Sequence, residues 1–219
     1  MPIQTPPPDT VHNWTERITM WMSRLLRWIS AHWLALANLG FGVLVGLPML
    51  APILYHWGYD GPAALIHAAF HPLCHQLPER SFFLFGPSVT YSYDELAALL
   101  GTGHVPARWV GAQDLGFKMA VCQRDIAVYG SMVLAGIAFA GLRPRLRPLS
   151  VRQFLLCIAP MAVDGGGQLV GLWSSTWLTR IITGALFGIA CILLTYPYLD
   201  RGMREVHAET SAALERGRL

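Results

Sequence analysis

The chain has 219 residues, of which 53% are hydrophobic and only 13% are charged, and its mean hydropathy is +0.41. A soluble domain carries about 25% charged residues, so this chain has too few charges to cover a soluble surface. The composition also excludes disorder, coiled coils and collagen, and a net charge of +3 is too small to indicate a nucleic-acid partner. What remains is an integral membrane protein with a single domain.

Two segments precede the first predicted span. Residues 1–13 are rich in proline near their start, and we expect them to be disordered. Residues 14–30 repeat tryptophan and leucine with a helical period and place arginines elsewhere on the helix. This pattern is typical of an amphipathic helix that lies at a membrane interface. The alternative is that this helix packs on the rest of the protein.

Four long apolar segments predict transmembrane helices, because each can cross about 30 Å of hydrocarbon. Residues 61–77 are also apolar, but Pro72 interrupts a stretch too short to span, which predicts a re-entrant or half helix. The expected fold is therefore an all-α membrane protein with four transmembrane helices, one re-entrant helix and an N-terminal interfacial helix. The four predicted spans cover residues 33–55, 115–139, 150–173 and 174–198.

The predicted membrane domain covers residues 14–200, and residues 78–114 form its extracytoplasmic loop. Within this loop, Ser92 and Glu95 have the spacing of a capping box, which predicts a short helix that ends near Gly101. Residues 201–219 are charged and form a cytoplasmic tail that we expect to be helical.

The placement of the basic residues predicts the orientation of the chain. If the turn at residues 143–152 faces the cytoplasm, both termini lie on the same side, together with eleven of the sixteen basic residues. This positive-inside bias predicts a multi-pass protein of the inner, or plasma, membrane with both termini in the cytoplasm. The other five basic residues are Arg80, Arg108, Lys118, Arg124 and Arg180.

Polar side chains within hydrocarbon mark the candidate site. A charge inside a span costs about 2.5–3.5 kcal/mol, so such residues indicate function by default. With a rise of 1.5 Å per residue, Cys122, Asp164 and Arg180 lie about 9–14 Å below the outer ends of their spans, and the re-entrant turn enters from that face. The residues expected to meet there are Cys74, His75, Gln76, Arg80, Lys118, Cys122, Arg124, Asp125, Asp164, Gln168 and Arg180.

One face of the second predicted span gathers several of these residues. Lys118, Cys122 and Asp125 follow one another at i, i+4 and i+7, so a continuous helix would align them. Three cations and two aspartates lie inside the predicted spans. The excess positive charge could be balanced by an anionic ligand or a thiolate. Glycine pairs four residues apart, at positions 42/46 and 184/188, permit close contact between helices.

Several short motifs follow one another in the chain. They are Cys74-His75-Gln76 with Pro78, Arg80 and Ser81, then Cys122-x-Arg124-Asp125 with Tyr129, then Asp164-Gly165 with Gln168, and Arg180 with Thr183-Gly184. Taken in order, over roughly residues 60–190, these motifs resemble the domain-of-unknown-function 2085 family of predicted bacterial and archaeal integral membrane proteins. The resemblance implies a membrane protein and implies no activity.

Three interpretations of the candidate site remain open. The first is a metal centre, since thiolate, imidazole and carboxylate groups suit zinc or another transition metal. The second is a redox pair of Cys74 and Cys122 that exchanges electrons with a quinone. The third is ordinary packing of buried cysteines with internal salt bridges. The predicted catalytic residues, which are also the predicted metal ligands, are Cys74, His75, Cys122 and Asp164.

The leading functional hypothesis is a membrane-embedded enzyme, either metal-dependent or based on thiol redox chemistry. Its substrate would be a lipid, a quinone, a thiol or an anionic small molecule, with the lipid bilayer as its surroundings and no nucleic acid involved. A hypothesis from another class is a non-catalytic transporter or an assembly subunit of a larger membrane complex. The predicted ligand-binding residues are Gln76, Arg80, Lys118, Arg124, Asp125, Gln168 and Arg180.

Overall fold

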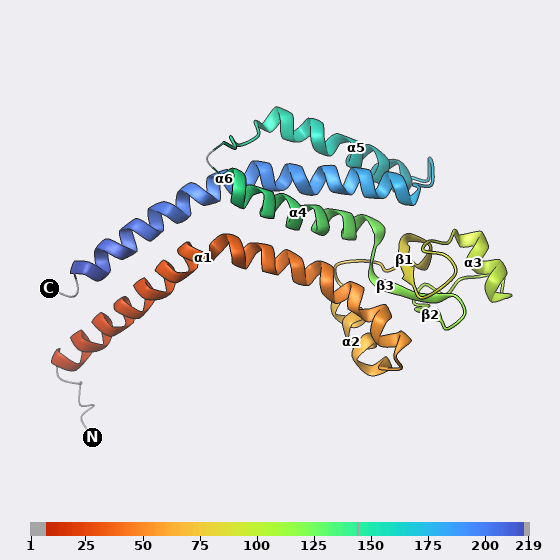
Figure 1. The fold of residues 1–219 in the computed structure, drawn as a ribbon, viewed down its shortest axis with the longest axis horizontal. Helices are drawn as coiled ribbons and strands as arrows, with labels where there is room; N and C mark the ends of the chain where they lie inside the picture. The colour runs from red at the N-terminus through yellow and green to blue at the C-terminus, as the bar shows by residue number, and fades with distance from the viewer. Residues whose placement is uncertain (1–7, 144, 217–219) are drawn as a thin grey trace, which may run out of the picture.

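The computed structural model describes residues 8–143 and 145–216, and over these residues it is mostly helical with one small sheet (Figure 1). The six helices are α1 (Pro8–His56), α2 (Asp60–Phe70), α3 (Tyr93–Leu100), α4 (Gln123–Leu142), α5 (Val151–Leu169) and α6 (Trp177–Arg216). A short 3-10 turn, Pro78–Arg80, precedes the three strands β1 (Ser81–Leu84), β2 (Gly111–Ala112) and β3 (Gly116–Cys122).

Four of the helices form a bundle, and the other elements lie at one end of it. Helices α1, α4, α5 and α6 run side by side, with α2, α3 and the sheet at one end (Figure 1). The described ends of α1 and α6 lie together at the opposite end (Figure 1). The chain therefore enters and leaves the bundle on the same side, and α2, α3 and the sheet lie on the other.

Three helices in the described part of the chain are long and apolar enough to cross a membrane. They are residues Trp14–His56 of α1, Gln123–Leu142 of α4 and Trp177–Arg216 of α6. Helix α5, which corresponds to the third of the four expected spans, is not among them. Its 19 residues include Arg152, Asp164 and two glutamines, which lower its mean hydropathy.

The N-terminal part is one helix rather than the two expected. Helix α1 runs without interruption from Pro8 to His56, where an interfacial helix at residues 14–30 and a separate span at 33–55 were expected. No glycine or proline occurs between residues 14 and 39, so nothing in this stretch breaks the helix. The side chains of Trp14, Trp21 and Trp28 are exposed, whereas the end of the segment packs on α6: Ser30 is buried, and its hydroxyl and the Arg27 carbonyl oxygen contact His207.

The two chain ends are described only in part. Residues 8–13 of the expected disordered segment belong to α1, whereas residues 1–7 lie outside the described residues. The expected helical tail is confirmed as far as Arg216, because α6 continues through it without a break, and residues 217–219 lie outside the described residues.

The second span starts eight residues later than expected. Residues 116–122 form the central strand of the sheet, and α4 begins only at Gln123. Strand β3 pairs in antiparallel fashion with the distant β1 and with β2, which directly precedes it, so strand neighbours satisfy its backbone groups. Gly116 has a φ of +83°, and a Cβ there would lie 2.5 Å from the Leu84 carbonyl oxygen. Glycine thus permits the close approach of the two chains at the start of the strand. Because Lys118 and Cys122 lie in β3 and only Asp125 lies in α4, the expected helical stripe of these three residues does not form.

Helix α3 forms as expected. The Ser92 hydroxyl accepts a hydrogen bond from the Glu95 amide, and the Glu95 carboxylate accepts one from the Ser92 amide. Gly101 ends the helix in the left-handed conformation with a φ of +66°. The local signals of this segment were therefore sufficient to define its helix.

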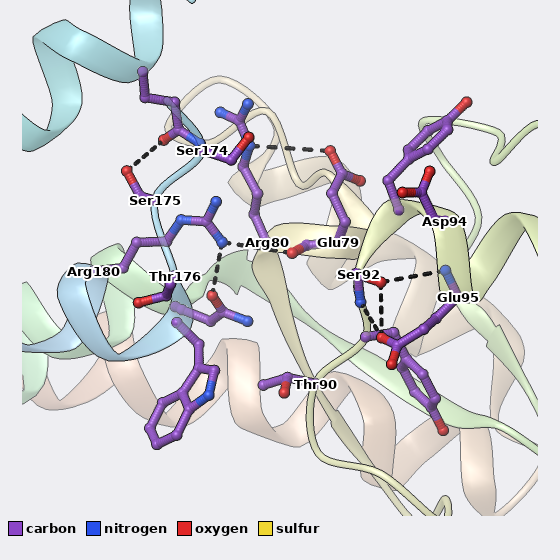
Figure 2. A pocket seen from close by; sticks show the side chains of 15 residues that line it. Glu79, Arg80, Thr90, Ser92, Asp94, Glu95, Ser174, Ser175, Thr176 and Arg180 are labelled. Atoms are coloured by element: carbon purple, nitrogen blue, oxygen red, sulfur yellow. Dashed lines mark hydrogen bonds and ion pairs between the residues drawn. The ribbon is translucent and has the colours of Figure 1, made fainter. Parts of the chain in front are cut away.

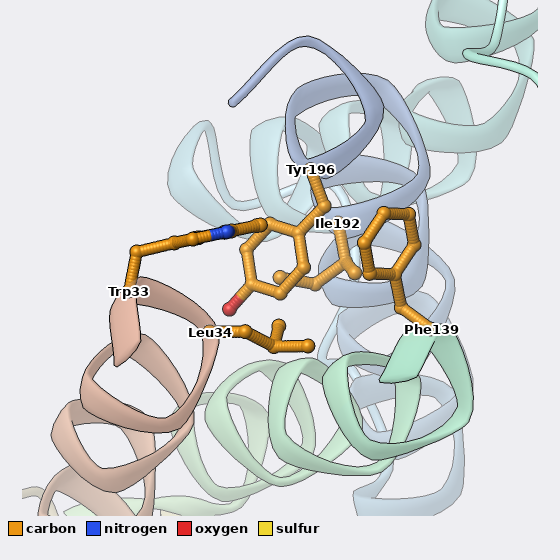
Figure 3. Packing of buried hydrophobic residues seen from close by; sticks show 5 residues of the cluster. All are labelled: Trp33, Leu34, Phe139, Ile192 and Tyr196. Carbon is orange, nitrogen blue, oxygen red and sulfur yellow. The ribbon is translucent and has the colours of Figure 1, made fainter. Parts of the chain in front are cut away.

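Aromatic packing holds three helices of the bundle together. Trp33 and Leu34 of α1, Phe139 of α4, and Ile192 and Tyr196 of α6 form a buried cluster (Figure 3). The Tyr196 ring meets Trp33 and Phe139 edge-on, with centroids 5.1 and 5.5 Å apart. Edge-to-face pairs of this kind add to the dispersion energy of close packing.

One of the two expected glycine contacts forms within the chain. A Cβ at Gly184 would lie 2.8 Å from the Arg124 carbonyl oxygen, and one at Gly188 would lie 2.4 Å from the Val128 carbonyl oxygen. These glycines let α6 approach the backbone of α4. A Cβ added at Gly42 or Gly46 of α1 would have no atom of the described residues within 4 Å, apart from its own helix backbone and chain neighbours.

Candidate metal centre

Two segments that are far apart in the sequence bring the candidate centre together. Cys74 lies in the turn after α2 and is buried among Ala51, Phe70 and neighbouring β3 residues. Cys122 ends β3 and is the N-cap residue of α4, and Asp125 lies in the first turn of that helix. The β3–α4 junction therefore presents a thiol and a carboxylate to the Cys74 turn.

The three side chains converge on one point. One ligand atom each from Cys74, Cys122 and Asp125 lies within 4.8 Å of the other two. The Cys122 amide donates a hydrogen bond to Cys74 Sγ at 3.2 Å, and Cys122 Sγ donates one to Asp125 Oδ2 at 3.1 Å. Ligands around a tetrahedral zinc ion lie roughly 3.3–3.8 Å apart, given metal–ligand bonds of about 2.0–2.3 Å. The group thus needs only small side-chain movements to enclose such an ion.

The electrostatic surroundings favour a thiolate at Cys74. The side chain of Cys122 lowers the pKa of the Cys74 thiol, against the opposing effects of burial and of the Asp125 carboxylate. Lys118 is nearly fully buried, with 1% of its surface exposed, and burial lowers its pKa to about 8. The thiolate is the form of cysteine that binds metals, so this environment suits a ligand.

Buried polar contacts hold the Cys74 turn in place. Lys118 Nζ donates a hydrogen bond to the Gln76 carbonyl oxygen. The Gln76 side chain donates to the His67 carbonyl oxygen at 2.7 Å, and Gln76 itself has a φ of +55°, which is rare for a residue other than glycine. Gln76 and Lys118, both expected to bind a ligand, thus serve in this structure to shape the turn.

A cavity of about 210 Å³ opens onto the three converging groups. His75 is exposed and lines this cavity, so its imidazole lies near the group without being one of the three converging ligands. Arg80 and Arg124 also line it and bring positive charge to its wall. The cavity leaves space beside the ligands for a small molecule or water.

Asp164 takes a different place from the one expected. Its carboxylate forms an ion pair with Arg124, which joins α5 to the first turn of α4. Asp125, expected to bind a ligand, joins the two cysteines in the converging group. The sequence offers a signal for this arrangement, because Cys122 and Asp125 are three residues apart and meet in one helical turn.

A second, larger cavity, shown in Figure 2, shares Arg80 with the first. It encloses about 700 Å³ between the 3-10 turn, the start of α3 and the α5–α6 connection. Arg180 lines it and donates hydrogen bonds from Nη1 to Gln123 Oε1 at 3.0 Å and to the Glu79 carbonyl oxygen at 3.5 Å. Gln168 lines it too and accepts a hydrogen bond from Ser175 at 3.3 Å.

Gln123 is a structural residue that the sequence did not reveal. It is 1% exposed, and its amide group donates to the Ser81 carbonyl oxygen at 3.1 Å while accepting from Arg180. It thereby ties the sheet to α6. Its place between the more distinctive Cys122 and Arg124 carries no signal that would have singled it out.

These features define a mostly helical membrane protein with a polar region at one end of its bundle, in which two cysteines and an aspartate converge. Residues 114–194 match the family described as "Predicted membrane protein (DUF2085)", which confirms the resemblance expected from the sequence motifs. The chain is also distantly similar to the uncharacterized protein MJ1492 of Methanocaldococcus jannaschii. The two are 27% identical over 135 residues, which cover 60% of this chain and 67% of that protein. No solved structure matches the chain.

Proposed function

We propose that this membrane protein binds a divalent metal ion of the zinc class through Cys74, Cys122 and Asp125, and that the ion is the centre of a membrane-embedded enzyme. The observation that carries the proposal is the convergence of these three ligand atoms on a single cavity. Two thiolates and a carboxylate are a ligand set that suits zinc and related transition metals.

The number of ligands supports a catalytic rather than a purely structural ion. Structural zinc sites have four protein ligands, whereas catalytic sites have three and keep one position for water or substrate. Here the cavity beside the group provides that position, and His75 at its edge is the alternative fourth ligand. A water bound to zinc ionises near neutral pH and becomes a nucleophile. Arg80 and Arg124 on the cavity wall would attract an anionic substrate.

The membrane topology forms part of the proposal. We infer four spans, with α5 as the least apolar of them, because α5 runs along α6 within the bundle (Figure 1). The common side of the two described ends supports termini in one compartment, and the arginine bias favours the cytoplasm of a plasma-membrane protein. The centre then faces the extracytoplasmic side, with residues 61–77 entering from that side.

Metal analysis of the purified protein tests the proposal. Protein in detergent, loaded with zinc and then dialysed, is expected to retain one equivalent, measured by elemental mass spectrometry. Cys122→Ser and Asp125→Asn are expected to lower the zinc content by tenfold or more, because each removes a ligand. Cys191→Ser is the matched control, since Cys191 lies in α6 away from the group and should leave the zinc content unchanged. Absence of bound metal in the parent protein, with four titratable thiols, would contradict the proposal.

A second candidate function follows from the contact between the two cysteines. The Cys122 amide donates to Cys74 Sγ, and neither cysteine forms a disulfide in the structure. Two thiols and a quinone would yield one disulfide and one hydroquinone, with two protons and two electrons passing from sulfur to the quinone. Incubation with a short-chain benzoquinone distinguishes the two functions. Loss of two thiols for each hydroquinone formed favours the redox function, and four persistent thiols with bound zinc favour the metal centre.

A further inference from the structure

Arg180 is a buried cation without an anionic partner in the described structure. Only 7% of its surface is exposed. Its Nη1 donates to two neutral acceptors, Gln123 and a backbone carbonyl, and its Nε is buried without a hydrogen-bond partner. Arg180 takes part in none of the ion pairs that the described residues form. A buried charge that lacks a counter-charge is costly, so its retention calls for an anion.

The carboxylates around the large cavity are engaged elsewhere or lie at its surface. Glu79 faces Arg80, with a distance of 4.0 Å between the charged atoms. Glu95 accepts the amide and hydroxyl hydrogens of Ser92 in the cap of α3. Asp94 is exposed at the start of the same helix. None of the three forms an ion pair with Arg180, which lines the cavity together with them (Figure 2).

The start of α6 adds further hydrogen-bond donors to the same wall. Ser174, Ser175 and Thr176 line the cavity directly before the helix. The Thr179 amide donates to Thr176 Oγ1 at 3.2 Å and the Arg180 amide donates to the Thr176 carbonyl oxygen at 3.1 Å. The amides of Trp177 and Leu178, the first two of the helix, have no partner within it. The positive end of the helix dipole lies here as well. The Ser175 and Thr176 hydroxyls already donate to Gln168 and Thr179. The Ser174 hydroxyl, the first two amides of α6 and Arg180 are left, and they form a donor set that fits a phosphate group.

We propose that the cavity of about 700 Å³ binds a phosphate group through Arg180, Arg80 and the first turn of α6. The cavity lies at the end of a candidate span, and phospholipid headgroups lie at the same depth. Trp177 and Leu178 next to it are exposed, as lipid-facing residues are. Arg80 lines both this cavity and the smaller one, so a bound phosphate compound would extend toward the Cys74 group. Binding itself needs no metal.

Two probes distinguish a lipid phosphate from a free one. Protein in dodecyl maltoside is titrated with inorganic phosphate by calorimetry and with phosphatidylglycerol in mixed micelles by native mass spectrometry. Binding of both probes assigns the site to the phosphate group as such, and binding of the lipid alone assigns it to a headgroup. Arg180→Gln is expected to weaken binding by tenfold or more, because it removes the charge-assisted hydrogen bonds. Arg108→Gln is the matched control, since Arg108 is exposed and lines a separate cavity near His67.

A second variant keeps the test decisive if Arg180→Gln does not fold. The side chain of Arg80 is 40% exposed and its ion pair is long, so Arg80→Gln should fold and still bind several-fold more weakly. Unchanged binding in this variant and in a folded Arg180→Gln protein, or binding of neither probe by the parent protein, would overturn the proposal. Zinc content in Arg180→Gln and phosphate binding in Cys122→Ser are both expected to persist. The failure of this proposal is therefore distinguishable from a failure of the metal centre.

Discussion

The bundle and the polar end region of this protein are held together by different contacts. We use "polar end region" for residues 71–80, the sheet, the first turn of α4 and the α5–α6 connection. In the bundle, the ring of Tyr196 packs on Trp33 and Phe139, and Gly188 lets α6 approach α4. In the polar end region, buried Lys118 and Gln123 donate hydrogen bonds to backbone carbonyl groups.

The difference follows from what each region must achieve. Bundle helices need only fit one another and present apolar side chains to lipid, so non-directional van der Waals packing is sufficient. The polar end region must hold two cysteines and an aspartate from different segments at fixed positions. Hydrogen bonds are directional, and leaving a buried donor or acceptor unpaired is costly, so they select one arrangement. Three substitutions follow in order of decreasing effect: one in the bundle, one at the boundary of the two regions, and one at the cap of α3, which lies outside both.

The largest effect is expected from Gly188→Leu, which breaks the bundle. A Cβ at Gly188 would lie 2.1 Å from Ser131 Oγ and 2.4 Å from the Val128 carbonyl oxygen, so α6 must move away from α4. Overpacking of this kind lowers the free energy of unfolding by about 3 kcal/mol. Thermal unfolding in detergent measures the loss. Gly46→Leu is the matched control, because a Cβ there would meet no other part of the described chain within 4 Å; an equal loss in both variants would contradict the packing argument.

Arg124→Gln is expected to have an intermediate effect at the boundary of the two regions. It leaves the Asp164 carboxylate without its cation, and both side chains are largely buried, with 19% and 13% exposed. Removing one member of a fully buried pair costs about 3–5 kcal/mol, and this partial exposure reduces the expected loss to about 2 kcal/mol. The double variant Arg124→Gln with Asp164→Asn should recover most of the stability. If it does not, the ion pair is not the cause of the loss.

The smallest effect is expected at the α3 cap. Ser92→Ala removes the hydroxyl that caps the helix and should lower its stability by about 1 kcal/mol. Hydrogen-exchange protection factors of the α3 amides measure this loss. Protection elsewhere in the sheet and bundle should stay unchanged, because the cap is local; a loss throughout the chain would contradict this view.

The same cap predicts a pH dependence. The hydrogen bonds from the amide and hydroxyl of Ser92 hold the pKa of Glu95 below its ordinary value of 4.5. A carboxylate with a lowered pKa in the folded state stabilises that state above 4.5, and its contribution is lost as the pH falls through the lowered pKa. Protection of α3 should therefore decrease in acid, and Glu95→Gln should remove this dependence.

The sequence was most informative where the structure is local. The cap and end of α3 depend on Ser92, Glu95 and Gly101, which lie within ten residues, and all three have the expected roles. Strand β3 was missed because its apolar residues continue directly into α4, so the segment resembles one long span. Its strand conformation depends on pairing with β1, more than thirty residues earlier, which no local pattern encodes.

The candidate site divides in the same way. The sequence by itself determined the membrane class, through its few charges and long apolar segments, and it identified the polar residues that apolar spans would avoid. Only the tertiary structure decided that Asp125 meets Cys122 and Cys74 while Asp164 pairs with Arg124. Cys74 and Cys122 are 48 residues apart, and which carboxylate completes their group depends on ångström-scale distances that arise only when the helices and the sheet pack together.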